Sequence, residues 1–196
     1  MKKIVLALGL CGVLNFAHAS SITLDNGTDI IGTYAYEYLI NTISLAANQS
    51  ITAASLAFNN ITLTATGNGD DISYDIINRN DATTVITDND TPGDYFVQTY
   101  PTKTTNLGQK NFTLGQNQTW SYTFTTGTLA TLNTYLTDGQ GLDIGIDPDC
   151  HYTVGSIIFS YTVTTTPNTR APDAASTVML LGAALTGLGL LRRKLS

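Results

Sequence analysis

The chain has 196 residues, of which 42% are hydrophobic and only 12% are charged, against ~25% charged residues in an average soluble protein. Between Ser20 and Asp173 it holds four basic and all 15 acidic residues, which gives a net charge of 4 − 15 = −11. A segment this acidic is repelled by phosphates, so we exclude nucleic-acid partners, and its apolar content argues against disorder.

The N-terminus has the pattern of a secretory signal peptide. Two lysines open the chain, an apolar run from Ile4 to Phe16 follows, and small residues stand at Ala17 and Ala19. We predict a signal peptide over residues 1–19, cut by signal peptidase after Ala19; the alternative is a retained membrane anchor. Leu10 precedes Cys11, which argues against lipidation there.

The central segment, residues 20–166, predicts one all-β domain, an antiparallel β-sandwich that is jelly-roll-like and holds one short helix. Runs of β-branched and aromatic residues recur between Gly, Asn and Asp clusters. The expected strands are Ser21–Leu24, Tyr34–Ser44, Ser55–Thr66, Ile72–Asn78, Thr83–Thr87, Tyr95–Tyr100, Asn111–Leu114, Thr119–Thr125, Leu142–Ile146 and Ser156–Thr166.

Apolar and polar residues alternate in the clearest strands, which predicts one buried and one polar face. Trp120, Tyr122 and Phe124 point one way in their strand. Leu129 and Leu136 mark a segment with helical spacing, which predicts a short helix that ends at Asp138-Gly139.

An acidic stretch near the end of the domain is the candidate metal site. Asp147, Asp149 and His151 are spaced by two, so an extended backbone places them on one face, and Asp138 and Asp143 add oxygens. Ca²⁺ prefers oxygen ligands, whereas a transition metal prefers the imidazole of His151. If the stretch binds a metal, we expect Ca²⁺, and we expect no other cofactor. The alternative that we favour is a polar turn begun by Asp147-Pro148.

A second acidic loop covers residues 88–94. It has the oxygen atoms that Ca²⁺ needs but lacks the EF-hand pattern ending in Glu, and a solvated hairpin turn is the interpretation we favour. Glu37 is the only Glu, and we expect it to face solvent from a strand.

Cys150 is the only cysteine of the predicted mature chain, so it is either a buried free thiol or part of an intermolecular disulfide. Alternation turns it away from its neighbour His151, which argues against a catalytic thiol. No catalytic motif stands out, and we expect no catalytic residues; paired Asp carboxylates of a hydrolase remain an alternative. The aromatic residues are expected in the core, with a sugar-stacking platform as the other option.

The C-terminus has three parts in order. Residues 167–173 form a tether and an extended motif with Pro172-Asp173. Residues 174–196 form a transmembrane segment that starts with small residues, Ser176-Thr177 among them, continues as an apolar run and ends in a basic tail with Arg192-Arg193. From Ala174 to Leu191 is 18 residues, about 27 Å as a helix, enough to span a hydrocarbon core.

This end resembles the PEP-CTERM sorting signals that exosortases recognise, in the variant that begins Val-Pro-Asp. The resemblance covers about the last 26 residues and rests on Pro172, Asp173, Ser176, Thr177 and the arginines Arg192 and Arg193, with Ala171 in place of Val. It implies inner-membrane anchoring through the apolar segment, exosortase cleavage near Pro172-Asp173, and delivery to the surface or extracellular matrix of a bacterium that makes exopolysaccharide. An ordinary single-pass anchor is the alternative.

These patterns together predict an exported, exosortase-processed surface or matrix protein with a noncatalytic structural or adhesive β-sandwich. A glycan-binding module, assisted by Ca²⁺ and directed at exopolysaccharide, is the first alternative. A secreted hydrolase that uses Asp carboxylates is the second.

Overall fold

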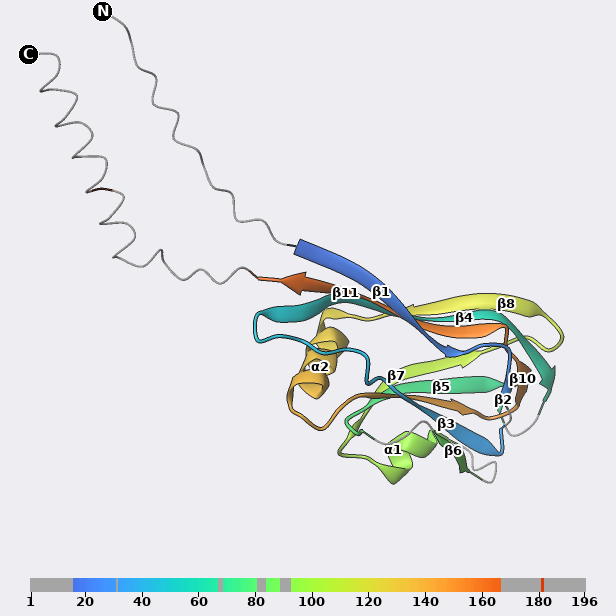
Figure 1. The fold of residues 1–196 in the computed structure, drawn as a ribbon. Helices are drawn as coiled ribbons and strands as arrows, with labels where there is room; N and C mark the ends of the chain where they lie inside the picture. Colours follow the sequence, from blue (N-terminus) through green and yellow to red (C-terminus); the bar gives the residue numbers. More distant parts are fainter. Residues whose placement is uncertain are drawn as a thin grey trace, which may run out of the picture. The chain divides into compact units, whose positions relative to one another are not determined.

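The computed structural model describes residues 16–30, 32–66, 69–80, 84–88, 93–166 and 181. Within these residues the chain forms two antiparallel sheets that pack face to face (Figure 1). The strands belong to one compact unit, Asn15–Thr165, and the predicted all-β sandwich is confirmed. No helix in this described part is both long enough and apolar enough to cross a membrane.

Sheet A is centred on the longest strand of the domain. Its order in the described chain is β1 (Phe16–Asp25), β11 (Ser156–Thr165), β4 (Gln49–Ala65), β10 (His151–Thr153) and β2 (Asp29–Ile30), and β8 (Asn117–Thr123) pairs with the other edge of β4. β10 and β11 follow one another along the same edge of β4, from Ala65 down to Gln49.

A bulge interrupts this long pairing. Asn60 has a positive φ of 52°, and the amide of Gly155 donates to the carbonyl oxygens of Asn59 and Asn60 at 3.0 and 3.3 Å. A Cβ at Gly155 would stand 3.0 Å from the Asn59 carbonyl, so the close approach favours glycine. A bulge bends its strand. On this edge β4 pairs with β11 before the bulge and with β10 after it.

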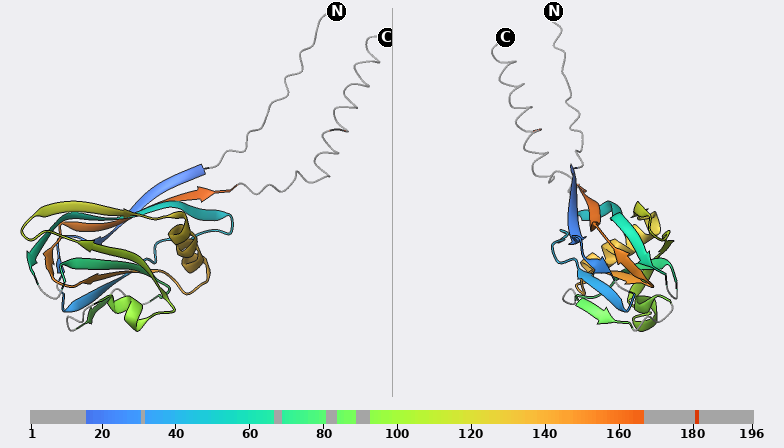
Figure 2. Two further views of the ribbon diagram at one scale, coloured as in Figure 1. Left: turned by 180° about the vertical axis from the view of Figure 1, so that it is seen from behind. Right: turned by 90° about the vertical axis from the view of Figure 1, so that its right-hand side faces the viewer.

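Sheet B lies beneath sheet A in Figure 1, and its central strands are buried on both faces. Its order is β6 (Thr84–Thr87), β3 (Tyr34–Leu39), β9 (Asp143–Pro148), β5 (Asp71–Ile77) and β7 (Thr104–Asn111). One face packs on sheet A. The other, predicted to face solvent, is covered by α1 (Tyr95–Thr99), which lies on the side away from sheet A (Figures 1 and 2).

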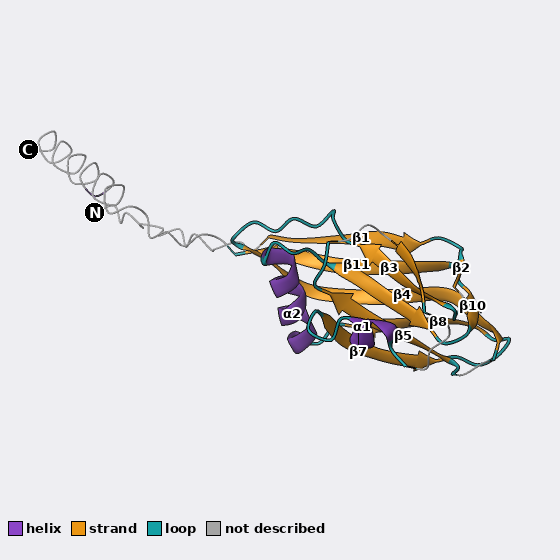
Figure 3. Cartoon of the chain, turned by 90° about the horizontal axis from the view of Figure 1, so that it is seen from below, coloured by secondary structure: helices purple, strands orange, loops and turns teal. Residues whose placement is uncertain are grey.

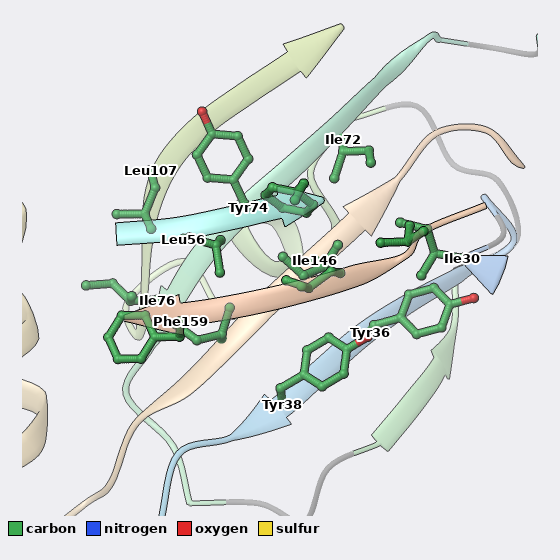
Figure 4. Close-up of a cluster of buried hydrophobic side chains, with 14 of the residues drawn as sticks. Ile30, Tyr36, Tyr38, Leu56, Ile72, Tyr74, Ile76, Leu107, Ile146 and Phe159 are labelled. Carbon is green, nitrogen blue, oxygen red and sulfur yellow. The ribbon is translucent and has the colours of Figure 1, made fainter. Parts of the chain in front are cut away.

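The core between the sheets is made of aliphatic and aromatic side chains from both layers (Figure 4). Tyr74 of sheet B packs its ring against Phe58 and Trp120 of sheet A, with centroids 6.2 and 5.0 Å apart. The predicted inward direction of Trp120, Tyr122 and Phe124 is confirmed, because all three pack in this core.

The predicted helix is confirmed as α2 (Thr126–Thr137), which lies at the end of the sandwich where β11 ends (Figures 1 and 3). The Thr125 hydroxyl accepts the first free amide, from Thr128, and Gly139 has a left-handed φ of 82° just past the end. Leu132 is fully buried, and Leu129 and Leu136 pack at the edge of the core.

The expected strand over Tyr95–Tyr100 is wrong, because this segment forms α1. The Asp94 side chain accepts hydrogen bonds from the amides of Phe96 and Val97 and so starts a helix despite the β-forming residues that follow. Burial of the Phe96 side chain against sheet B then stabilises the helical turn.

Other strand boundaries also differ from expectation: β3 ends at Leu39 and not at Ser44, and β4 begins at Gln49 and not at Ser55. The strand expected over Asn111–Leu114 is wrong, because only Asn111 is in a strand, as the last residue of β7, and Leu114 forms an isolated bridge to Leu63. Most of β7, from Thr104, was missed because Leu107 is its one buried residue. β10 was missed because it has only three residues. β1 begins at Phe16, so the predicted signal-peptidase cut after Ala19 falls inside it and leaves Ser20–Asp25 to pair with β11.

Candidate functional site: buried carboxylates on sheet B

Three neighbouring strands place acidic side chains on the outer face of sheet B. Tyr36 and Tyr38 of β3 point to the core, so Glu37 between them points outward. Gly145 of β9 pairs with Glu37 on one side and with Asp75 of β5 on the other. Asp143 and Asp147 flank Gly145 at two-residue spacing, so they share this face.

Helix α1 covers this face through one aromatic ring. Phe96 is fully buried and clusters with Ala35 and Ile77 over Gly145. A Cβ at Gly145 would stand 2.7 Å from Phe96 Cδ2, so only glycine lets the ring lie this close to the strand. The acidic side chains around Gly145 are therefore sealed from water by α1.

Glu37 is almost completely buried, with 1% of its surface exposed, so the expectation that it faces solvent is wrong. Arg79 Nη1 lies 3.4 Å from Glu37 Oε2, and its guanidinium lies 4.1 Å from the Tyr100 ring centroid. Burial, and next the contact with Glu37, raise the pKa of Asp143 to about 8, while Arg79 opposes the rise. One arginine therefore serves two buried carboxyl groups.

A second group lies on the same face, at the start of α1. The Tyr95 amide donates to Asp147 Oδ2 at 2.7 Å, and Asn106 donates to Asp94 Oδ2. Asp75 is 0% exposed and lies within hydrogen-bonding reach of the Asp94 carboxyl group. We call Asp75, Asp94 and Asp147 the aspartate triad.

The charges that act on this triad come mainly from other aspartates. Burial, followed by Asp94, raises the pKa of Asp75 to about 9. Burial also raises the pKa of Asp147 to about 7; the bond from the Tyr95 amide opposes this, and Asp88 and Asp94 add to it. The neutral acids are thus favoured over bare carboxylates.

Asp149 and Asp71 form another close pair at the end of this sheet. Burial, and then contact with Asp71, raise the pKa of Asp149 to about 7. A Cβ at Gly69 would stand 2.8 Å from an oxygen of each carboxyl group, which places both around this glycine.

The five residues of the predicted metal site are distributed over separate places. The chain leaves sheet B at Pro148 and enters sheet A at His151, so the extended backbone that was to align Asp147, Asp149 and His151 is interrupted by a turn. His151 is exposed on β10, and Asp138, at the end of α2, accepts from Asn78 and Gln140. Among the described residues no three His, Cys, Asp or Glu side chains are close enough together to hold a metal ion as they stand.

The described ends of the acidic loop at 88–94 are less solvated than the favoured hairpin turn predicts. Asp88 is buried, with 6% exposure, and its amide donates to the Thr33 carbonyl oxygen. Asp94 caps α1. The two described acidic ends of this loop thus turn toward sheet B, where Asp147 is their neighbour.

Cys150 is buried, as expected, with 3% exposure, and it forms no disulfide within the described chain. Its thiol donates to the Gly69 carbonyl oxygen at 2.6 Å. A disulfide to another molecule would require this turn to open first.

A groove lies elsewhere, on the outer face of sheet A. It encloses about 560 Å³ and is lined by Ala19, Ser20, Ser21, Ala53, Ala54, Ser55, Thr123, Ser160, Tyr161 and Thr162. A neighbouring groove of about 280 Å³ uses Phe16 and His18, which precede the predicted cut. Neither groove is lined by an acidic side chain.

The remaining predicted residues lie outside the part that the structure describes. They are Pro172, Asp173, Ser176, Thr177, Arg192 and Arg193. Of the predicted signal-cleavage residues, Ala17 and Ala19 both lie on the exposed strand β1.

Sequence reasoning missed Glu37, Asp75 and Arg79 as members of a site. A signal for the first two exists, because each acid stands within a run of aromatic or aliphatic residues that forms a buried strand. An acid in such a run is rarely buried without a partner, so it marks either a pair or a ligand site.

Comparisons with known proteins add little to this geometry. No family model matches the chain, and no curated protein matches it. A solved structure of infectious bursal disease virus, Gx strain, is 10% identical and aligns over 85% of this chain and 38% of its own, with a TM-score of 0.28. T=1 particles derived from the same virus give 11% identity, 94% and 53% coverage, and a TM-score of 0.24. The chain spans little more than half of either viral chain at most, and at these TM-scores the likeness carries no argument.

Proposed function

We propose that this chain is an exported protein, sorted by an exosortase and left at the cell surface or in the extracellular matrix, where its β-sandwich is a noncatalytic structural or adhesive module. Its export and sorting rest on the signal peptide, residues 1–19, and on the ordered motif, apolar segment and basic tail over residues 167–196. Signal peptidase and an exosortase are the processing partners.

The observation that carries the noncatalytic part is the position of the buried carboxylates. Glu37, Asp75, Asp143 and Asp147 lie under α1, whereas the grooved outer face of sheet A presents small hydroxyl and methyl groups. The groove is lined by small Ala, Ser and Thr side chains and by no acidic residue, which argues against chemistry on a small substrate there.

The finer architecture belongs to the same proposal. The chain crosses between the layers several times: β1, β2, β4, β8, β10 and β11 belong to sheet A, and β3, β5, β6, β7 and β9 belong to sheet B. Such crossing supports a jelly-roll-like sandwich, flanked by an N-terminal signal peptide and a C-terminal transmembrane sorting helix.

Intact mass of the protein recovered from its host tests the processing. We expect a product that begins at Ser20 and ends near Asp173, with or without a covalent adduct. A mass that retains the stretch from Val178 to Ser196 would mean an ordinary membrane anchor instead. Efficient turnover of a defined substrate by this protein would refute the noncatalytic role.

Glycan binding is a second candidate, favoured by the groove on sheet A. Hydroxyl groups of Ser55, Ser160 and Thr162 line it, and hydroxyl groups suit a sugar. Tyr161 also borders the groove, but its ring stacks on buried Phe159, and most other aromatic residues are in the core as well, which leaves little for a stacking platform. Glycan arrays with and without a chelator test this, and no signal with matrix polysaccharides would count against it.

A hydrolase remains the third candidate because Asp75 and Asp94 face each other with a raised pKa on Asp75. Paired carboxyl groups of unequal pKa are the acid and base of many hydrolases. Substrate would reach them only after α1 lifts from Gly145. Loss of a measured hydrolytic activity in Asp75→Asn would support this candidate.

A further inference from the structure

The outer face of sheet B holds two acidic groups that differ in their counter-charge. Glu37 and Asp143 share the guanidinium of Arg79. The aspartate triad, Asp75, Asp94 and Asp147, lies on the same face, but the charges that raise its pKa values come from aspartates. Asp75 and Asp147 are buried, Asp94 is half-buried, and among the described residues none of the three forms an ion pair with a cation, so the charge of the group needs compensation.

Unpartnered oxygen atoms point to what is needed. Both carboxylate oxygens of Asp75 and Oδ1 of Asp147 accept no hydrogen bond from the residues that the structure describes, although Asp75 is 0% and Asp147 is 1% exposed. A contact between the Asp75 and Asp94 carboxyl groups would need a shared proton. Buried acceptors without donors are rare in native proteins, and each calls for an ion, a water or a proton.

The triad is otherwise well oriented. The Tyr95 amide holds Asp147 Oδ2, and the amides of Phe96 and Val97 hold Asp94 Oδ1. These bonds fix two of the carboxyl groups and leave Asp147 Oδ1 and the Asp75 oxygens available. All the ligand atoms are hard oxygens, with no sulfur or imidazole among them, and such a set suits Ca²⁺ rather than a transition metal.

We propose that Asp75, Asp94 and Asp147 bind one Ca²⁺ ion, which ties α1 to the outer face of sheet B. The described side chains are not already spaced as a set of three ligands. The ion therefore completes the site by drawing the carboxylates together, and water fills the remaining places of a six- to eight-oxygen shell, as is common for Ca²⁺.

Binding of this ion has a structural consequence. The triad joins β5, β9 and the residue that caps α1, so the ion links a helix of five residues to two strands. Such a short helix is marginal by itself. With the ion bound, α1 and the Phe96 ring stay on Gly145; without it, the segment opens more often. This inference does not depend on the proposed surface or matrix function.

The test uses the full-length protein in mild detergent, freed of metal with a chelator. Thermal unfolding, followed by tyrosine and Trp120 fluorescence, is compared without and with about 1 mM CaCl₂, the range of extracellular Ca²⁺ modules. We expect Ca²⁺ to raise the midpoint by several degrees, and MgCl₂ to raise it less because Mg²⁺ demands a regular octahedron. Tb³⁺ luminescence excited through tyrosine, displaced by Ca²⁺, measures binding directly.

Two variants and a matched control locate the site. Asp75→Asn and Asp147→Asn should each weaken Ca²⁺ binding at least tenfold, and Asp147→Asn keeps an oxygen for the Tyr95 amide. Asp143→Asn makes the same change on β9 beside Arg79 and should retain the full Ca²⁺ response.

Three results would overturn the proposal. The first is a wild-type midpoint that Ca²⁺ does not move, with Asp75→Asn at least as stable as wild type; Asp75 would then be a neutral acid that shares a proton with Asp94. The second is an equal loss of the response in Asp143→Asn, which would indicate general screening. The third is an unchanged response in Asp147→Asn.

Discussion

Glu37, Asp143 and Arg79 show how one cation supports two buried acids on a covered sheet face. Glu37 comes from β3, Asp143 from β9, and Arg79 follows β5. The guanidinium also lies over the Tyr100 ring, so its position is fixed from two sides. Because the pKa of Asp143 is raised here, the protonation of this residue makes the stability of the fold depend on pH.

The pH dependence of stability is predicted from Asp143. Its pKa is about 8 in the folded chain, raised by burial and then by Glu37, against about 4 when unfolded. The stability it contributes is therefore complete below about pH 4 and is lost as the pH rises through 8. In thermal unfolding between pH 5 and 9, Asp143→Asn should lose less stability than wild type and exceed it by a few degrees at the alkaline end.

The pKa of other buried carboxyl groups, such as Asp149, is also raised, so they too make the protein less stable as the pH rises. The test therefore compares the change in unfolding midpoint of Asp143→Asn with that of the wild type. Asp138→Asn, at an exposed helix end, is the control and should follow the wild-type curve. Parallel curves for wild type and Asp143→Asn would show that Asp143 is ionised throughout.

At the scale of elements, the Asn133 side chain connects α2 to the backbone of sheet A. Asn133 Oδ1 accepts from the Ile51 amide at 2.8 Å, and its Nδ2 donates to the carbonyl oxygens of Ile51 and Leu129, each at 2.9 Å. Ile51 lies at a register shift between β4 and β11, where the ladder itself leaves backbone groups to be satisfied. Asn133 thus completes the ladder at this point.

Replacing Asn133 by Ala should therefore destabilise the protein more than its partial exposure suggests. It leaves the amide and carbonyl of Ile51 without partners, each of which costs about 1–3 kcal/mol when buried. We expect the free energy of unfolding in urea to fall by about 2 kcal/mol. Thr134→Ala, one residue on and exposed, should change it by less than about 0.5 kcal/mol. Equal effects of the two changes would contradict this role.

The contact of α1 with sheet B makes a second prediction at this scale. Gly145→Ala places a methyl group 2.7 Å from Phe96 Cδ2, and overpacking of this kind costs about 1–3 kcal/mol. The smaller side chain in Phe96→Leu should make room, so the double variant should lose less stability than the sum of the single changes. Urea unfolding of the four proteins measures this, and simple additivity would mean that the ring moves freely.

Prediction from sequence was correct for elements in which the spacing of apolar residues reflects which side is buried. Trp120, Tyr122 and Phe124 alternate because one face of β8 meets the core, and the spacing of Leu129 and Leu136 reports the buried side of α2. Prediction of the solvent-facing side failed for the central strands of sheet B. These strands are buried on both faces, so a polar residue in them no longer indicates contact with solvent. Asp94 shows a further limit, since its cap overrides the strand propensity of the residues after it.

At the scale of the molecule, the uneven charge is the main feature. The segment from Ser20 to Asp173 carries a net charge of −11, and a single ion pair, Arg79–Glu37, is found among the described residues. The two-layer architecture follows from the sequence because many short alternating strands have few other ways to bury one face. The candidate site does not, because it depends on which strands become neighbours.

Stability of the whole molecule should therefore increase with monovalent salt. Self-repulsion of a net −11 charge is screened as the Debye length falls from about 10 Å at 0.1 M to about 3 Å at 1 M salt. We expect the unfolding midpoint, measured with a chelator present, to rise by a few degrees from low to high NaCl. Choline chloride should act equally, since screening does not depend on the cation. A fall in the midpoint would contradict net repulsion.

The place of β11 in sheet A has a mechanical consequence. β11 is the last strand of the described chain, it lies between β1 and β4, and ten of its residues, from Ser156 to Thr165, pair with β4 with one register shift near the C-terminal end. If the protein is held by its C-terminus while the far end of the sandwich is attached to another body, tension runs along the axis of β11. The hydrogen bonds to β4 and β1 are then loaded together in shear, rather than one after another as when a zipper opens. In the proposed surface role, attachment through the C-terminus would therefore load the domain along a strand that is paired on both sides.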